Sequence, residues 1–364
     1  MKIVVYAIAK NESSFVDRWM DSMSEADQVV VLDTGSDDGT AERLRARGAR
    51  VAVEQIIPWR FDRARNRSLE LVPEDADVCV CTDLDEMFRP GWRTALEQAW
   101  TPGSSQAQYR YTWSFQPDGS EGVVFWQEKI HARRGFRWVH PVHEVLEWVG
   151  EGERGPMVSV QGIQLNHHPD PKKSRGQYLP LLELSVAEDP EDDRNLHYLG
   201  REYLYYGRWD DCIRTLTRHL ALPSAVWRDE RAASMRYIAR AHARKGERDE
   251  ARDWYLRAAA EAPHLREPWT DLAMLLYEDQ EWDGVLYATA CALKIRERPR
   301  TYICEAEAWG SLPHDLRCQA YYHTGRLPQA LEEARLALAA APSDPRLAGN
   351  AALLEKMAGT AGEL

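Results

Sequence analysis

Two carboxylates, Asp83 and Asp85, stand two residues apart directly after the apolar run Val78–Cys81. Such a run is typical of a buried strand, and a turn after it brings both carboxylates near one point. Oxygen ligands of this kind suit Mg²⁺ or Mn²⁺, which would bridge them to a diphosphate. A solvated acidic turn explains the same residues, because the chain is rich in acid.

Polar segments also follow two earlier apolar runs. Lys10-Asn11-Glu12 follows Ile3–Ala9, and residues 33–40, beginning with Asp33, follow residues 29–32. Short apolar runs that alternate with helical spacing predict a mostly parallel sheet, whose strands end at one ligand-binding edge. The three polar segments therefore predict a single site there. For residues 33–40, a strand–helix turn rich in capping residues is an equally good explanation.

A fourth polar segment opens a helix predicted over residues 63–72. Asp62, Arg65 and Asn66 are neighbours on one face of that helix, because they are three and four residues apart. A guanidinium at the start of a helix can bind phosphate oxygens. An ordinary ion pair on a surface helix is the alternative.

The periodicity changes twice along the chain. From about residue 108, aromatic and polar residues alternate around a turn signal at 117–120, which predicts a hairpin. Further extended structure is expected over 136–149, so the predicted sheet is mixed. From residue 195 the strand signals vanish and small residues recur at unequal intervals. These residues are Gly200, Ala239, Ala273 and Cys318.

The recurring small residues resemble those of tetratricopeptide repeats, in which the two helices of a unit approach closely. Leu199-Gly200-x-x-Tyr203 is the best local match, and the unequal intervals predict insertions between units. A capping helix is expected over residues 344–358. Repeats of this kind suit protein contacts, so both a homodimer and the binding of a macromolecular substrate through this region are compatible with the pattern.

The bulk composition narrows the class of protein. A length of 364 residues favours two domains, and 44% hydrophobic with 29% charged residues is typical of a folded globular chain. The net charge of −12 disfavours non-specific binding to nucleic acid. The run Ile3–Ala9 is too short to span a bilayer, so we expect no membrane contact and a cytoplasmic location. The six cysteines match no zinc spacing.

Taken together, residues 9–12, 33–40, 61–66 and 83–86 resemble, in order, the motifs of glycosyltransferase family 2. Residues 141–146 and 165–169 resemble segments of a bacterial and phage subgroup, which includes the peptide S-glycosyltransferases of glycocin biosynthesis and phage glycosyltransferases. The resemblance implies an α/β GT-A catalytic domain over residues 1–175. It also implies an all-α, tetratricopeptide-like domain with a capping helix over residues 176–364.

The resemblance further implies a metal-dependent, inverting enzyme that takes a sugar from a nucleotide-sugar donor, a UDP-sugar, with Mn²⁺ or Mg²⁺ as cofactor. The donor pocket would be lined by Asn11, Glu12, Asp33, Asp62, Arg65, Asn66 and Asp83. The metal ligands would be Asp85, Asp83 and His167, with His168 as the alternative histidine. A hydrogen-bonded, buried histidine is the alternative reading of either one.

The base that takes the acceptor proton is expected to be Glu144, with His143 holding it or acting in its place. Glu128 and Glu86 are weaker candidates, and a purely structural role of His143 and Glu144 in the substrate loop is the alternative. The acceptor stays open between a peptide, a modified base of phage DNA and a glycan. Lys172, Lys173 and Arg175 are predicted to help hold an anionic acceptor.

Two other functions compete with this reading. A sugar nucleotidyltransferase would carry a glycine-rich basic loop after the first strand, and Lys10-Asn11-Glu12 is not such a loop. A non-catalytic helical-repeat scaffold with a degenerate transferase-like domain would be expected to lose its metal-binding acids. The retention of Asp33, Asp83 and Asp85 argues against that scaffold at the level of sequence.

Overall fold

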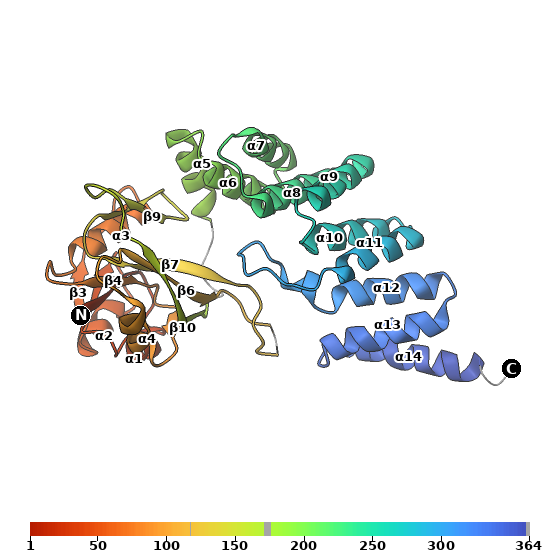
Figure 1. Ribbon diagram of the computed structural model, residues 1–364, viewed down its shortest axis with the longest axis horizontal. Coiled ribbons are helices and arrows are strands. Elements are labelled where there is room, and N and C mark those ends of the chain that lie inside the picture. The colour runs from red at the N-terminus through yellow and green to blue at the C-terminus, as the bar shows by residue number, and fades with distance from the viewer. Residues whose placement is uncertain (117, 171–175, 362–364) are drawn as a thin grey trace. The chain divides into compact units, whose positions relative to one another are not determined.

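The computed structural model describes residues 1–116, 118–170 and 176–361 (Figure 1). The chain forms two compact units, Met1–Ser185 and Val186–Leu364. The boundary predicted after residue 175 lies outside the described residues. So do Lys172, Lys173 and Arg175, the basic residues predicted to hold an acceptor.

The first unit is built around an eight-stranded sheet. Its strands are β1 Ile3–Ala9, β2 Gln28–Asp33, β3 Arg50–Val53, β4 Val78–Cys81, β5 Glu86–Phe88, β6 Gln106–Thr112, β7 Val124–Ala132 and β10 Met157–His167. Their order across the sheet is β3-β2-β1-β4-β7-β6-β10-β5. The first four strands are parallel, whereas β7 runs antiparallel to β4 and β6. The sheet is therefore mixed.

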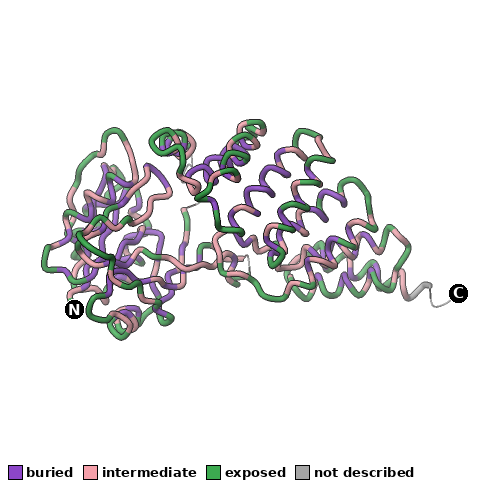
Figure 2. Tube along the Cα trace, turned by 45° about the horizontal axis from the view of Figure 1, so that its top comes forward, coloured by how far each residue is buried: buried purple, intermediate pink, exposed green. Residues whose placement is uncertain are grey.

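Both faces of the central strands are buried, as their continuous apolar sequence requires. Val5 belongs to a core cluster with Trp19, which lies on α1 (Val16–Ser22). The next side chain along the chain, Val4, points to the opposite face and packs in a second cluster with Leu69 and Trp138. Leu69 comes from α3 (Phe61–Glu70) and Trp138 from β8 (Phe136–Val139). Figure 2 shows this buried centre in purple.

The remaining elements of this unit are two helices and a small hairpin. Helix α2 spans Thr40–Ala46 and α4 spans Trp92–Ala99. The extended structure expected over 136–149 is a separate pair of strands, β8 and β9 (Val145–Trp148), which are antiparallel. Between them His140 and His143 adopt positive φ angles of 76° and 52°, which non-glycine residues seldom do. Of the turn predicted at 117–120, residue 117 is outside the described residues.

The second unit consists of helices that pack as antiparallel pairs. In chain order they are α6 Asp193–Tyr205, α7 Trp209–Ala221, α8 Arg228–Lys245, α9 Arg248–Glu261, α10 Glu267–Glu278, α11 Trp282–Lys294, α12 Leu312–His323, α13 Leu327–Ala340 and α14 Pro345–Ala361. Helix α5 (Tyr178–Glu188) spans the boundary between the units. Each helix of a pair contacts its partner, and α6, α8, α10 and α12 also contact one another in succession.

Small residues hold these pairs together where the sequence pattern placed them. Gly200 on α6 has no room for a side chain, because a Cβ atom would lie 2.3 Å from Cγ of Leu216 on α7. Ala239 and Ala273 are fully buried at the corresponding places on α8 and α10. The helical repeat is therefore a consequence of close approach between paired helices, as small residues allow.

The longest interval between the small residues, from 273 to 318, contains an insertion, residues 295–311. Its regular structure is a single turn of 3₁₀ helix, η1 (Ala306–Trp309). Ile303, Cys304 and Ala308 of the insertion are buried. It therefore packs onto the helices of its own unit and does not extend into solvent as a loose loop.

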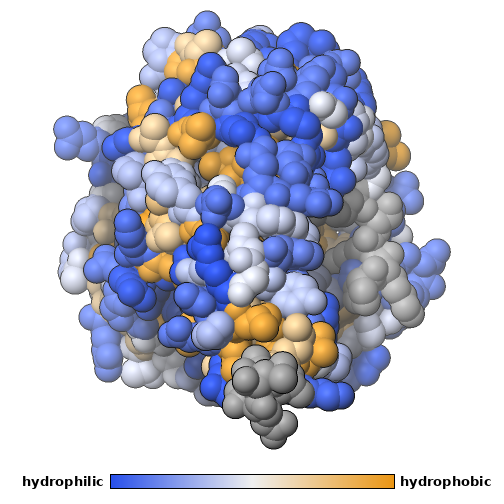
Figure 3. Space-filling view, turned by 90° about the vertical axis from the view of Figure 1, so that its right-hand side faces the viewer, coloured by the Kyte–Doolittle hydropathy of each residue, from blue (hydrophilic) through white to orange (hydrophobic). Residues whose placement is uncertain are grey.

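The surface of the second unit is mixed. Figure 3 shows a mostly hydrophilic face, on which apolar groups gather in a few places. Leu336 on α13 and Leu353 on α14 are exposed apolar residues near the end of the chain. Among the described helices, none combines the length and the apolar character that crossing a membrane requires.

Candidate functional site

The segments that follow β1 and β2 are hydrogen-bonded to each other. The backbone N–H of Asn11 donates to Ser36 Oγ at 2.9 Å, and the side-chain oxygen of Asn11 accepts from the N–H of Asp37. The N–H of Glu12 donates to Thr40 Oγ1. The sheet edge therefore does gather these polar segments, and many of their groups bond one another.

Asp33 is fully buried at the end of β2. One of its carboxylate oxygens, Oδ1, accepts hydrogen bonds from the N–H groups of Gly35 and Ser36 at 2.9 and 2.8 Å. The other oxygen, Oδ2, has no hydrogen-bond partner among the described residues. Asp33 therefore shapes the turn that follows β2.

Arg65 is the centre of a buried charge cluster at the same edge. Its guanidinium donates to Asp83 at 2.9 Å and to Glu144, and it also contacts Cys81 Sγ at 3.4 Å. Burial alone would lower the pKa of Arg65, but the charges of Asp83 and Glu144 outweigh burial and raise that pKa well above its usual value. The ammonium of Lys129 lies 3.4 Å from Asp83. The cluster is thus compensated by its own members.

Glu144, the residue predicted to act as base, is held by Arg65, and only 9% of its side chain is exposed. His143, at its positive φ angle, places its ring 5.7 Å from that of Tyr178. Glu86 is buried, accepts from the Tyr111 hydroxyl at 2.8 Å, and has its pKa raised chiefly by burial. Glu128 is exposed on β7.

Asp62 and Asn66, the neighbours of Arg65 on the predicted helix face, bind partners outside the Arg65 cluster. Asp62 forms an ion pair with Arg60, at 2.8 Å between Nη2 and Oδ2. The side-chain amide of Asn66 donates to the carbonyl of Trp138 and accepts from its N–H, both at 2.8 Å. Asn66 thus ties α3 to β8, and Arg65 is the member of this face that reaches Asp83.

Asp85, the second carboxylate of the Asp83–Asp85 pair, lies beside His167, which the sequence analysis predicted to be a metal ligand. His167 Nε2 is 3.6 Å from Asp85 Oδ2, and its Nδ1 lies 2.9 Å from the carbonyl of Trp113. Burial alone would lower the pKa of His167, but Asp85 outweighs it and raises that pKa. His168 stacks on Phe115 instead, and burial lowers its pKa. The structure thus brings together Asp85 and His167, and the role of Mn²⁺ or Mg²⁺ there stays a prediction.

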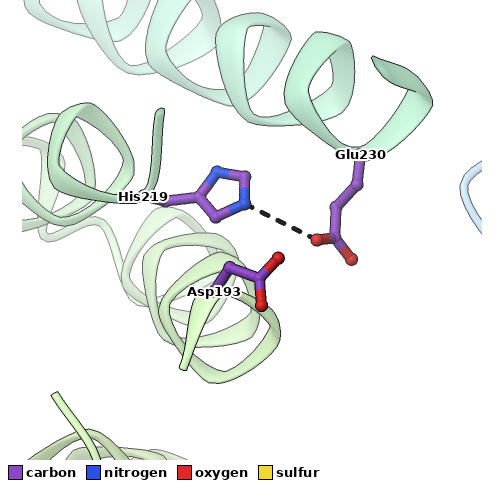
Figure 4. Close-up of side chains that lie close together, drawn as sticks. All are labelled: Asp193, His219 and Glu230. Atoms are coloured by element: carbon purple, nitrogen blue, oxygen red, sulfur yellow. Dashed lines mark ion pairs between the residues drawn. The ribbon is translucent and has the colours of Figure 1, made fainter. Parts of the chain in front are cut away.

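A second group of possible cation ligands lies in the helical unit, at residues that the sequence analysis did not name as ligands. Asp193, His219 and Glu230 come from α6, α7 and α8 and place three donor atoms within 4.8 Å of one another (Figure 4). His219 is fully buried, with Nε2 3.5 Å from Glu230 Oε1. Burial alone would raise the pKa of Glu230, but His219 and the Tyr302 hydroxyl help to lower it to about 2.

A further polar arrangement of the helical unit joins the insertion to α6, α8 and α10. Tyr302 stacks on Tyr198, with ring centroids 5.9 Å apart, and its hydroxyl donates to Glu230. Glu305 forms ion pairs with Arg236 at 2.8 Å and Arg240 at 2.7 Å. The sequence analysis missed these residues. Two signals in the sequence could have indicated them. One is the pair of arginines four residues apart on one helix, and the other is the long repeat interval that contains the insertion.

Comparison with known proteins finds no family model that matches this chain. Similar solved structures are tetratricopeptide-repeat proteins. MamA is 19% identical, with a TM-score of 0.36 over 44% of this chain and 84% of its own. The protein TTC0263 of Thermus thermophilus is 19% identical, with a TM-score of 0.36 over 48% and 88%. YrrB is 13% identical, with a TM-score of 0.38 over 49% and 84%.

These findings correct the central prediction from the sequence. The proteins that the chain resembles are tetratricopeptide-repeat proteins and not glycosyltransferases, so the assignments to family 2, to the GT-A fold and to an enzyme are wrong. The expected UDP-sugar donor and acidic donor motif have no support, whereas the tetratricopeptide-like repeat does. The physical reason is that short polar motifs at strand ends also serve internal pairing, as Arg65 and Asp83 show.

Proposed function

We propose that this chain is a helical-repeat scaffold that binds partner proteins through one face of its second unit. The observation that carries the proposal is the insertion, residues 295–311, which lies against α6, α8 and α10 through side-chain contacts. We call the five residues that receive it the contact face. The contact face consists of Tyr198, Trp227, Arg236, Arg240 and Glu267.

The architecture supports this function. Stacked helix pairs present extended surfaces for polypeptide partners, because each pair repeats the same exposed face along the array. The contact face combines aromatic rings with arginine, the residue types that dominate the energetics of protein interfaces. Its residues come from three successive helix pairs, so a bound segment would span several repeats.

The polar cluster of the first unit also fits a structural role better than a reactive one. Glu144 and Asp83 both bind the buried guanidinium of Arg65, and Lys129 adds a second cation beside Asp83. Both carboxylates are thus engaged by cations of the same unit, and removing one partner would leave an uncompensated buried charge. The cluster joins α3, which carries Arg65, to the turn after β4 and to the segment between β8 and β9.

A peptide selection tests the scaffold function. Random displayed peptides are selected on the purified full chain and, in parallel, on Glu305→Ala, which loosens the insertion. We expect bound peptides to slow amide hydrogen exchange in α6, α8 and α10. In the Glu305→Ala background, where the insertion is already loosened, Arg240→Ala should weaken that binding at least tenfold, because arginine on the contact face provides charge-assisted bonds.

The matched control is Arg244→Ala, an exposed arginine on the same helix as Arg240. It should leave peptide affinity unchanged. Two results would overturn the proposal: no peptide enriched on either protein above a bare support, or slowed exchange confined to Met1–Ser185.

A further inference from the structure

The insertion contacts the contact face as a short peptide ligand would, with an aromatic, an acidic and a second aromatic residue in sequence. Tyr302 is the first of these. It stacks on Tyr198 and meets Trp227 edge-on at 5.5 Å, and Arg194 lies 5.9 Å from its ring centroid. Aromatic neighbours in offset and edge-on geometry favour a flat ring at this position.

Glu305, three residues further on, is the acidic element. Its carboxylate binds both Arg236 and Arg240, and Asp271 holds the same two arginines from α10 at 2.9 and 3.0 Å. Burial alone would raise the pKa of Glu305, but the two guanidiniums outweigh burial and lower that pKa to about 2. Glu305 thus gives the arginine pair a second carboxylate, beside the one that Asp271 provides from α10.

Trp309 is the second aromatic element. Its indole N–H donates to Glu267 Oε1 at 2.9 Å, and the backbone N–H of Glu305 donates to the same oxygen at 3.0 Å. The guanidinium of Arg266 lies 4.4 Å from the Trp309 ring centroid. Glu267 is almost fully buried, so its carboxylate fixes both the backbone and the side chain of the segment.

The helices do not depend on the insertion for their packing. A core cluster of Ala239, Leu272, Val285, Leu316 and neighbouring residues joins α8, α10, α11 and α12 directly. If Glu305 moved away, Asp271 would still pair with Arg236 and Arg240. Displacement of residues 302–309 would expose Ile303, Cys304 and Ala308 but would leave these contacts between the helices in place.

From this geometry we infer that the contact face is a binding site for a polypeptide segment with an aromatic residue followed, three positions later, by an acidic residue. Residues 302–309 occupy that site as an internal ligand, which a partner segment must displace. The inference rests on the proposed scaffold function and names the chemistry of the partner. An aromatic–acidic segment is selected because arginine pairs bind carboxylates and the rings of Tyr198 and Trp227 stack on a flat side chain.

A fluorescent peptide with the sequence of residues 298–310, carrying Cys304→Ser, tests this inference. It is titrated into the full chain and into the double variant Tyr302→Ala/Glu305→Ala, whose insertion has lost both contacts. We expect binding to the double variant at least tenfold tighter than to the wild-type chain, because the wild-type site is already filled. A peptide in which alanine replaces both Tyr302 and Glu305 should bind at least tenfold more weakly to the double variant.

Two controls keep the outcome interpretable. Glu297→Ala removes an exposed acidic residue of the same insertion and should behave as the wild type. The milder variant Glu305→Gln, which keeps the shape of the side chain, replaces the double variant if thermal melting shows that the latter has not folded. It should bind the peptide more tightly than the wild type does.

The outcomes separate this inference from the scaffold function on which it rests. If the peptide does not bind the opened variants while selected peptides still slow exchange in α6, α8 and α10, the inference is overturned and the scaffold function stands. If the peptide binds wild type and opened variants equally, the insertion is no internal ligand and the inference fails. If neither kind of peptide binds, both proposals fail.

Discussion

Each unit of this protein holds an arginine-centred charge cluster, and the two clusters differ in how their carboxylates are attached. In the first unit, Arg65 is bound by Asp83 and Glu144, with Lys129 nearby. In the second unit, Arg236 and Arg240 are bound by Asp271 on α10 and by Glu305 on the insertion. Only 9% of the Glu144 side chain is exposed, against 32% for Glu305.

The difference shows that the same kind of ion pair can be a fixed part of the fold in one unit and can exchange its carboxylate for another in the other unit. A buried cluster whose members all come from packed elements contributes to the native fold, since removing one member leaves an uncompensated charge. A cluster in which one carboxylate lies on an irregular, partly exposed segment can exchange that carboxylate for another. The predictions below test this contrast.

The largest effect is expected from Arg65→Met. The change leaves Glu144 without its cation in a buried place, which should cost about 3–5 kcal/mol of unfolding free energy. Urea unfolding followed by tryptophan fluorescence measures it. Arg63→Met, at an exposed position of the same helix, should change stability by less than about 0.5 kcal/mol. Equal effects of the two substitutions would contradict the structural role of the first cluster.

Both units should lose stability as the pH falls from about 6.5, because each holds a buried neutral histidine. Burial lowers the pKa of His131 to about 4 in the first unit and that of His197 to about 3 in the second. Between these values and about 6.5, the unfolded chain binds a proton that the folded chain does not. Each histidine should therefore cost about 2 kcal/mol at pH 5.

Thermal melting of the wild type between pH 7 and pH 5 checks this dependence. His131→Asn should reduce the loss of stability of the first unit over this range, because the substituted side chain does not titrate. An unchanged pH dependence in that variant would show that other groups govern the acid sensitivity of the unit.

Arg236→Met should cost less than Arg65→Met, although both arginines are buried. Arg240 stays in place and binds Asp271 and Glu305 at 3.0 and 2.7 Å, so both carboxylates keep a cation. A loss of about 1–3 kcal/mol is expected in the same urea experiment. A larger loss than for Arg65→Met would reverse the contrast between the clusters.

The smallest effect on stability is expected from Arg240→Ala, whose consequence should be local. Glu305 keeps Arg236 at 2.8 Å but loses its second cation, so the insertion should be held less firmly while the helices stay packed. Trypsin should then cleave after Arg300 several-fold faster than in the wild type, as mass spectrometry of the fragments would show. Arg244→Ala should cleave at the wild-type rate, and equal rates for the two variants would mean that Glu305 does not hold the insertion.

Much of the fold is predictable from local patterns. The runs 3–9 and 28–32 are strands, and the small residues at 200, 239 and 273 lie where helices meet. The unequal repeat intervals indicate an insertion. Where that insertion packs depends on long-range contacts such as Tyr302 with Tyr198, which no periodicity encodes.

The candidate site was harder to predict for the same reason. Polar residues at strand ends indicate the edge where Asp83 and Arg65 meet, but not that they would bind each other. A free carboxylate and a paired one have the same sequence signature. The contact face has a weak one, Arg236 and Arg240 four residues apart on α8, because its other three residues lie on different segments far apart in the chain.

The most direct test of the scaffold account is hydrogen–deuterium exchange of the wild-type chain with and without a saturating aromatic–acidic peptide. The account predicts that amides at 301–310 exchange faster when the peptide binds, because the insertion is displaced, while amides of α8 become slower. Unchanged exchange at 301–310 together with slower exchange elsewhere in the chain would contradict displacement from the contact face.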